Sequence, residues 1–445
     1  MKLSQHNIVS RAAAVLHLAP ATAQAAAGGR SPGVGLSHVL FHPSSQQELN
    51  HRNVVIDAIG VGITAGVGSF LSVFLVRLGA SNTQVGLLTA MPALTGMLLS
   101  IPIGEFLSRR SNIVPWFARS RFAVLICYVL TGLVPFFVPQ QATPTAIIAI
   151  WAVATLPQTL VSVGFTVVMG AVAGPGGRLN LMSHRWSVLG LTNSLTVLIV
   201  GQILPIFDFP LNYQLVFIGS GIGALISVVM SSTLRLPPVS APPASRNLIQ
   251  TFRQHGRTLR TNQAFMRFAA SSFVFRWGMM MAGPLFPIYW VKNVEATDPA
   301  IGVINSTQTL VMMGGYYLWT RMSRRRGERW VLLVTTFGVS FYPLLTALTH
   351  QVQPLVIWAA LAGLFSAGVD LVFFDILLDA CPGDQQAAYV GMFQSSVFLA
   401  AFLAPLVGTA MSDAVGIAPA LILASVIRFA GFGLMLALGV GKDTH

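Results

Sequence analysis

Apart from the charges of the loops and adjoining helix ends, seven charged side chains stand within, or at the end of, long apolar segments of this sequence. They are Asp57, Glu105, Arg276, Asp370, Asp375, Asp379 and Arg428. A charge placed in hydrocarbon costs about 3 kcal/mol on insertion scales, so each is expected to face a cavity or a partner. Groups of this kind bind the ionic part of a solute or carry protons, which makes these residues the first candidates for chemistry.

Asp57 and Arg276 stand at nearly corresponding places in two related segments. A spacing of 216 residues relates the segments and aligns Arg276 with Gly60, about one helical turn deeper than Asp57. The two side chains are expected to pair across a cavity or to flank one anionic group of a substrate. The alternative for Asp57 is a helix-end acid that is hydrogen-bonded near water.

Asp370, Asp375 and Asp379 share one apolar segment. At about 100° per residue, Asp375 and Asp379 lie on one side of a helix, and Asp370 lies about 140° around from Asp375. Asp370 is the deepest of the three. A carboxyl group removed from water holds its proton more tightly, so Asp370 is expected to carry a proton. The alternative is a permanent ion pair with Arg276 or Arg428.

The remaining candidates are two charged residues with expected partners and several uncharged polar residues. Asp379, at a helix end, is expected to meet the arginines of segment 321–329, and Arg428 to pair with an acid or a lipid headgroup. Uncharged polar residues offer further substrate contacts, although such groups often only bridge helices in a bilayer. They are Gln158, Ser162 and Thr166, at spacings that share one helix face, and Trp277 beside Arg276.

Composition defines the elements that must position these side chains. Of 445 residues, 54% are apolar and 9% are charged, and the mean hydropathy is +0.71. Soluble proteins average roughly 25% charged residues, and a soluble core cannot hold this much apolar surface. Because a membrane span needs about 20 apolar residues, the sequence predicts twelve transmembrane helices. They lie near 53–77, 84–107, 115–138, 145–173, 182–206, 212–234, 266–291, 299–320, 330–350, 354–380, 387–411 and 417–440.

The net charge of +13 reflects membrane topology rather than nucleic-acid binding. The even-numbered loops carry most of the arginines, while the odd-numbered loops carry Arg77, Lys292 and a few acids. Cytoplasmic loops hold the excess of Lys and Arg, so both termini are expected in the cytoplasm. The predicted organisation is a disordered tail (1–52), a six-helix half (53–234), a basic cytoplasmic linker (235–265), a second six-helix half (266–440) and a short tail (441–445).

The two halves repeat one pattern. Ile150-Trp151-Ala152 returns as Ile357-Trp358-Ala359, and Pro175-Gly176 returns as Pro382-Gly383, both at a spacing of 207. Internal repeats of apolar segments are typical of membrane transporters. The fold predicted is therefore an all-α integral membrane protein with two pseudo-symmetric six-helix halves around a central cavity.

Twelve spans, a basic central linker and two six-span copies resemble the major facilitator superfamily. That family carries a Gly-x-x-x-Asp-Arg-x-Gly-Arg-Arg pattern after its second span. This chain keeps Gly104 and Arg109 of it, with Ser108 at the Asp position, and the second copy keeps Arg325. The resemblance implies a central cavity lined by spans 1, 4, 7 and 10. It also implies gating roles for Gly104, Glu105, Arg109, Arg325 and Asp379.

These features predict a secondary active transporter that moves a small organic solute by alternating access, with proton coupling and with export favoured over uptake. The alternatives are a passive facilitator, or a non-transporting receptor or assembly factor on the same fold. We expect no enzymatic activity, because all nine histidines lie outside the span cores. No cofactor, metal or nucleic-acid partner is expected. The predicted state is a monomer in the plasma (inner) membrane, with the bilayer, the solute and protons as partners.

Overall fold

The computed structural model describes residues 45–110, 112–174, 178–236, 262–381 and 386–441. Apart from short connections, this part of the chain is helical and contains no strand. The helices of the first half are α3 (Gln46–Gly68), α4 (Leu71–Arg77), α5 (Asn82–Ser108), α6 (Val114–Phe137), α7 (Thr143–Ala173), α8 (Arg178–Ile203), η2 (Leu204–Ile206), α9 (Leu211–Gly219) and α10 (Gly221–Ser232). Those of the second half are α12 (Gln263–Ala282), α13 (Leu285–Lys292), α14 (Asp298–Arg326), α15 (Glu328–Ala347), α16 (Val352–Asp379), α17 (Gln386–Val415) and α18 (Ile417–Ala437).

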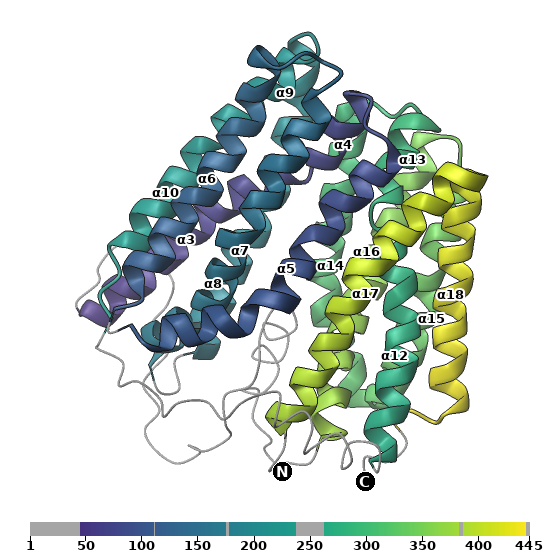
Figure 1. The fold of residues 1–445 in the computed structure, drawn as a ribbon. Helices are drawn as coiled ribbons and strands as arrows, with labels where there is room; N and C mark the ends of the chain where they lie inside the picture. The colour runs from purple at the N-terminus through teal and green to yellow at the C-terminus, as the bar shows by residue number, and fades with distance from the viewer. Residues whose placement is uncertain (1–44, 111, 175–177, 237–261, 382–385, 442–445) are drawn as a thin grey trace.

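Consecutive short helices join into twelve units of membrane-spanning length. Within the described residues, ten of these units are apolar enough to cross a membrane on length and composition. The other two are the α12–α13 pair, which carries Arg267 and Arg276, and α14, which ends in Arg324, Arg325 and Arg326. Both stand in the bundle beside the other ten (Figure 1). Their polar side chains, rather than a different placement, account for their lower hydropathy.

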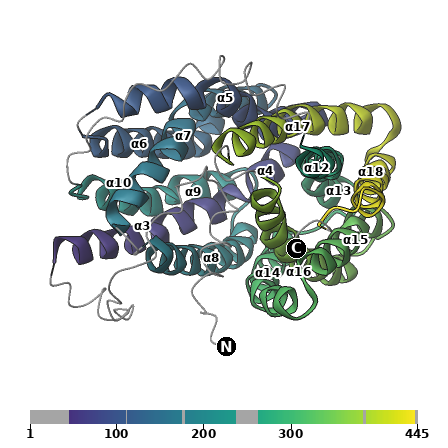
Figure 2. The same cartoon turned by 90° about the horizontal axis from the view of Figure 1, so that it is seen from below.

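The helices pack as two groups that meet along two seams. In the first group α3 contacts α8 and α10, and α7 contacts α5 and α6; in the second, α16 contacts α14 and α15, and α18 contacts α12 and α15. Between the groups, α5 lies against α17 and α8 lies against α14 (Figure 2). These two seams hold most of the contacts between the groups.

Both halves break their first span at a corresponding place. Span 1 is interrupted at Ser69-Phe70, between α3 and α4, and span 7 at Gly283-Pro284, between α12 and α13. Proline lacks the N–H that would continue a helical ladder. In transporters, interrupted helices at matching positions of the two repeats mark the binding site, because broken backbone at membrane depth is tolerated where it borders a cavity.

The first helix begins earlier than predicted. α3 starts at Gln46 instead of residue 53, because Ser45 caps it and accepts a hydrogen bond from the Glu48 backbone N–H at 3.2 Å. Residues 46–52 are therefore helical and not part of a tail. The rest of the predicted tail, most of the 235–265 linker and the two repeated Pro-Gly turns lie outside the described residues.

Candidate functional site

The two halves are joined at one end of the bundle. We call it the closed end; it carries the loops 78–81, 207–210 and 293–297 (top of Figure 1). Arg77 of the first half and Asp298 of the second form an ion pair with an Nη2–Oδ1 distance of 2.7 Å. The Tyr213 hydroxyl donates to the same carboxylate oxygen at 2.6 Å, and Arg77 also donates to the Ala296 carbonyl at 3.0 Å. Asp298 thus receives a cation and a hydroxyl from the opposite half.

A second cluster joins α5 to α13 and α17 at the same end. Lys292 Nζ donates to Asn82 Oδ1 at 2.8 Å, and Asn82 Nδ2 donates to Ser412 Oγ at 3.0 Å. Thr83 Oγ1 donates to Asp413 Oδ2 at 2.7 Å. On the other seam, Gly201 and Gly302 allow close backbone contact, since a Cβ at Gly201 would lie 3.3 Å from the Gly302 Cα. The closed end is therefore sealed by polar contacts and close packing between the halves.

Loop composition places Arg77 and Lys292 among the odd-numbered loops, and the acids of those loops include Asp298 and Asp413. Their contacts between the halves were not predicted from the sequence. A usable signal was present in the sequence. Arg77 ends span 1 and Asp298 begins span 8 at the same predicted membrane face, so opposite charges face each other across the repeat.

Beneath the closed end lies a cavity of about 290 Å³, which we call the inter-half cavity. Ser69 and Ser72 border it from the first half, at the break in span 1. Gly283, at the break in span 7, borders it from the second half, together with Asn305 and Gln308 of α14. The cavity thus lies where both halves interrupt their first helix.

Arg428 of α18 also lines the inter-half cavity. Its side chain is 3% exposed, and its Nη1 donates to the Val339 carbonyl oxygen at 3.1 Å. In the described part of the chain, no carboxylate contacts this guanidinium. The sequence-based expectation of an acid partner for Arg428 is therefore wrong for these residues.

Arg276 and Asp370 form a looser cluster in the second half. The Tyr316 hydroxyl donates to Asp370 Oδ2 at 3.2 Å, and the Arg276 guanidinium lies over the rings of Phe373 and Phe393, at 5.1 and 5.6 Å from their centroids. Arg276 is close enough for its charge to attract the Asp370 carboxylate. Across the described residues, however, the two form no direct ion pair within 4.0 Å. The structure brings them together without the permanent contact considered from the sequence.

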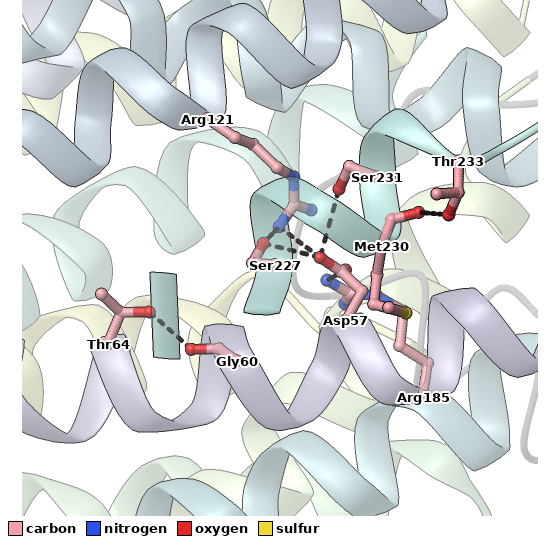
Figure 3. Close-up of polar contacts among 9 residues, drawn as sticks. All are labelled: Asp57, Gly60, Thr64, Arg121, Arg185, Ser227, Met230, Ser231 and Thr233. Carbon is pink, nitrogen blue, oxygen red and sulfur yellow. Dashed lines mark hydrogen bonds and ion pairs between the residues drawn. The ribbon is translucent and has the colours of Figure 1, made fainter. Parts of the chain in front are cut away.

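Asp57 takes neither of its expected positions. It is 3% exposed on α3, and its Oδ1 lies 2.7 Å from Arg121 Nη1 of α6, while Oδ2 lies 3.5 Å from Arg185 Nη2 of α8 (Figure 3). The hydroxyls of Ser227 and Ser231 donate to Oδ1 at 2.7 and 3.3 Å, and Arg121 also donates to Ser227. Asp57 therefore pairs within its own half, neither with Arg276 nor at a watery helix end.

The Asp57 cluster borders a second cavity, of about 370 Å³, inside the first half. Arg121 and Arg185 line it, and so do Gln158 and Ser162 of α7, as their shared helix face predicted. Thr166, one turn further along α7, is not among the lining residues. Arg185 also lies over the Phe165 ring at 4.5 Å. Two arginines share one aspartate here, which leaves a net positive charge beside largely apolar walls.

The other predicted substrate contacts are less central. Trp277 packs against Phe273, with ring centroids 5.7 Å apart, and does not line either cavity. Asp375 is buried on α16, whereas Asp379, four residues later, is exposed because it ends the helix. Among the described residues, Asp379 forms no ion pair with the arginines of segment 321–329; it borders a small pocket with Arg267 of α12 instead.

The predicted gating residues lie at the end opposite the closed end. Glu105, Arg109 and Arg325 are exposed. A Cβ added to Gly104 would meet no heavy atom within 4 Å, so this conformation does not require glycine there. Within the described residues, no group of three or more His, Cys, Asp or Glu side chains could hold a metal ion.

The fold and the cavity between its halves define a polytopic helical membrane protein built from two six-helix repeats. A model of the Major Facilitator Superfamily matches residues 268–444, which is most of the second half. Over residues 268–444 the chain is similar to that superfamily. Solved transporter structures share the architecture of most of the chain.

Two solved structures illustrate the shared fold. A bacterial homologue of the human lysosomal transporter Spinster, solved in an inward-facing and unoccupied conformation, superposes with a TM-score of 0.67 and 14% identity, covering 89% of this chain and 97% of that one. The nucleoside transporter NupG superposes with a TM-score of 0.69 and 10% identity, covering 88% and 99%. At these identities the likeness establishes the fold alone.

One curated relative is similar in sequence. The Staphyloferrin B transporter of Staphylococcus aureus is 24% identical over 163 residues, which are 36% of this chain. The matched region spans only 39% of that relative's length.

Proposed function

We propose that this protein is a secondary active transporter that carries a small organic solute across a membrane by alternating access. The observation that carries the proposal is the inter-half cavity, bordered by both helix breaks and lying beneath the closed end. A solute held there is cut off from one side of the membrane by the Arg77–Asp298 contact. Rocking of the halves would break that contact and open the other side.

The sidedness follows from charge. With the basic even-numbered loops in the cytoplasm, both termini are cytoplasmic and the closed end faces outward. The described conformation is then open towards the cytoplasm. Gly104, Glu105, Arg109, Arg325 and Asp379 would form the opposite gate when the closed end separates. We propose a monomer in the plasma membrane.

Proton coupling is proposed through Asp370. Among the described residues, its carboxylate accepts a hydrogen bond from the Tyr316 hydroxyl and has the Arg276 charge nearby without a direct ion pair within 4.0 Å. A carboxyl group so placed can gain or lose a proton without breaking a strong salt bridge, so its protonation can follow the pH on the side to which it opens. Export is the proposed direction, because the apolar cavity in the first half suits amphipathic compounds.

Transport by purified protein in liposomes tests the proposal. Radiolabelled benzoate, thymidine and tetraphenylphosphonium serve as anionic, neutral and cationic probes, each with and without an imposed pH gradient. The proposal expects at least one probe to accumulate against its concentration gradient when the pH gradient is present, beyond its accumulation in empty liposomes under the same gradient. Equilibration without accumulation would instead indicate a passive facilitator. Fluxes equal to those of empty liposomes for all three would favour a non-transporting receptor.

A further inference from the structure

The inter-half cavity carries an uncompensated positive charge. Among the described residues that line it, Arg428 is the one permanent cation, and none is Asp, Glu or Lys. The other polar lining groups are hydroxyls and amides, such as Ser69, Asn305 and Gln308. The cavity therefore offers a cation and neutral polar groups, with no protein carboxylate to balance the charge.

The Arg428 guanidinium is buried without its full set of partners. The residue is 3% exposed, Nη1 has a backbone carbonyl, and Nε has no hydrogen-bond partner. A buried charge without a counter-ion is strongly unfavourable unless something else supplies the opposite charge. Gly278 fixes this position, since a Cβ there would lie 2.9 Å from Arg428 Cγ and 2.7 Å from the Ala424 carbonyl.

An aromatic wall stands beside this cation. Phe286 stacks on Tyr342 with ring centroids 4.5 Å apart and on Trp290 with centroids 6.1 Å apart, and all three side chains line the cavity. Trp290 is 4% exposed, and its Nε1 has no hydrogen-bond partner. The Trp290 N–H is thus a second buried hydrogen-bond donor in the cavity that carries Arg428, beside the rings of Phe286 and Tyr342.

From these contacts we infer that the inter-half cavity binds the carboxylate of a small aromatic acid, held by Arg428 with help from Trp290, while the aromatic ring packs against Phe286 and Tyr342. Guanidinium groups bind carboxylates with two parallel hydrogen bonds. The bound anion would supply the counter-charge for Arg428 that none of the described lining residues provides. The inference rests on the proposed transport function and assigns that site a substrate class.

A lipid phosphate shares the oxyanion chemistry, so the source of the anion must be distinguished. The volume of about 290 Å³ and the participation of both halves favour a small molecule that fits between them. A lipid headgroup would have to bring its acyl chains to the same place.

Equilibrium binding to the purified full-length protein, in neutral detergent with phosphatidylcholine, tests the inference. The probes are radiolabelled benzoate and indole-3-acetate, and the competitors are benzamide and indole-3-acetamide, which keep the shape without the charge. At least one acid is expected to bind and its amide to compete at least 10-fold less well. Arg428→Gln should weaken binding roughly 10- to 100-fold, because it removes a charged hydrogen-bond donor.

Two further variants keep the test decisive. Ser425 lies one turn from Arg428 on α18, and its hydroxyl donates to the Ser340 carbonyl. Ser425→Ala is the control: it removes that hydrogen bond and should leave acid binding unchanged. If Arg428→Gln fails to fold, Trp290→Phe keeps the ring and removes the donor, and it should weaken binding roughly 3- to 10-fold. Equal binding by wild type and Trp290→Phe would then overturn the inference.

Other outcomes separate the claims. The inference is wrong if neither acid binds, if the amides bind as well as the acids, or if added phosphatidylglycerol alone occupies the site. Binding of an acid without any flux in liposomes would contradict the transport function but leave the anion site standing. Flux of thymidine or tetraphenylphosphonium without acid binding would support the transport function and contradict the anion site.

Discussion

Replacing Asp298 with asparagine should loosen the closed end without changing its shape. Arg77 Nε and Nη2 lie 2.9 and 2.7 Å from Asp298 Oδ1, and the Tyr213 hydroxyl lies 2.6 Å from it. Asparagine keeps an acceptor oxygen but loses the charge. Hydrogen bonds to charged groups contribute about 1.5–3 kcal/mol and neutral ones about 0.5–1.5, so the loss is about 1–2 kcal/mol. The side chains are 27% and 11% exposed, so solvent screening is modest.

A loss of that size should raise the population open at this end roughly 5- to 30-fold. The assay is labelling of Ser72→Cys, which lines the inter-half cavity beneath the closed end. The native Cys127 and Cys381, both buried, are replaced first. A membrane-impermeant thiol reagent is added to intact cells, so that it reaches the cavity only through the closed end. The labelling rate should rise by the same factor in Asp298→Asn.

The matched control is Asp208→Asn. Asp208 lies in loop 207–210 at the same end and is exposed. The same chemical change there should leave the labelling rate unaltered. Equal labelling rates for Asp298→Asn and Asp208→Asn would show that the Asp298 contacts do not hold this end shut.

Three other substitutions have defined outcomes. Asp57→Asn leaves two buried arginines without a counter-charge and should destabilise the protein by about 3–5 kcal/mol, which lowers the unfolding midpoint by roughly 5 °C. The double variant Asp57→Asn/Arg121→Gln should recover part of that loss. An unchanged midpoint in the single variant would contradict the burial of the cluster. A Cβ at Gly60 would lie 2.3 Å from a carbonyl oxygen of α10, so Gly60→Ala should lower the unfolding midpoint, whereas Gly170→Ala, with no atom within 4 Å, should leave it equal or slightly higher. Asp370→Asn should abolish the effect of a pH gradient on transport while leaving downhill exchange intact, measured in liposomes; a preserved pH effect would exclude Asp370 as the proton carrier.

The membrane fold could be predicted because the length of an apolar segment and the charge of a loop are both properties of short, continuous stretches of sequence. Each apolar run is long enough to identify a span without knowledge of its neighbours. The first span was placed too late because the helix continues through polar residues as far as its Ser45 cap. Hydropathy alone gives no signal for helix that extends beyond the hydrocarbon.

Partners of the charged residues could not be predicted in the same way. Asp57 is neutralised by Arg121 and Arg185. In the sequence these two belong to the excess of arginines in and beside the even-numbered loops, which indicates topology and gives no partner. Both arginines lie two turns into their helices, at a depth and rotation that depend on tertiary packing. Arg276, the alternative partner considered for Asp370, lies close enough for its charge to act on that carboxylate, but the two form no direct ion pair among the described residues. Span identity gave no information on Arg428, because the resemblance does not place span 12 at the cavity.

In the proposed transport cycle, the halves separate at the closed end each time the site opens outward. Thr83→Cys/Asp413→Cys places two thiols across the halves, at side chains that lie 2.7 Å apart. Gln84→Cys/Thr145→Cys places two thiols at the same end within the first half, at side chains 3.2 Å apart. Each pair is cross-linked with a short reducible bifunctional thiol reagent, and flux of a transported probe is measured in liposomes. The first cross-link should abolish flux, reduction should restore it, and the second cross-link should have no effect. Undiminished flux with the halves cross-linked at the closed end would show that they need not separate there.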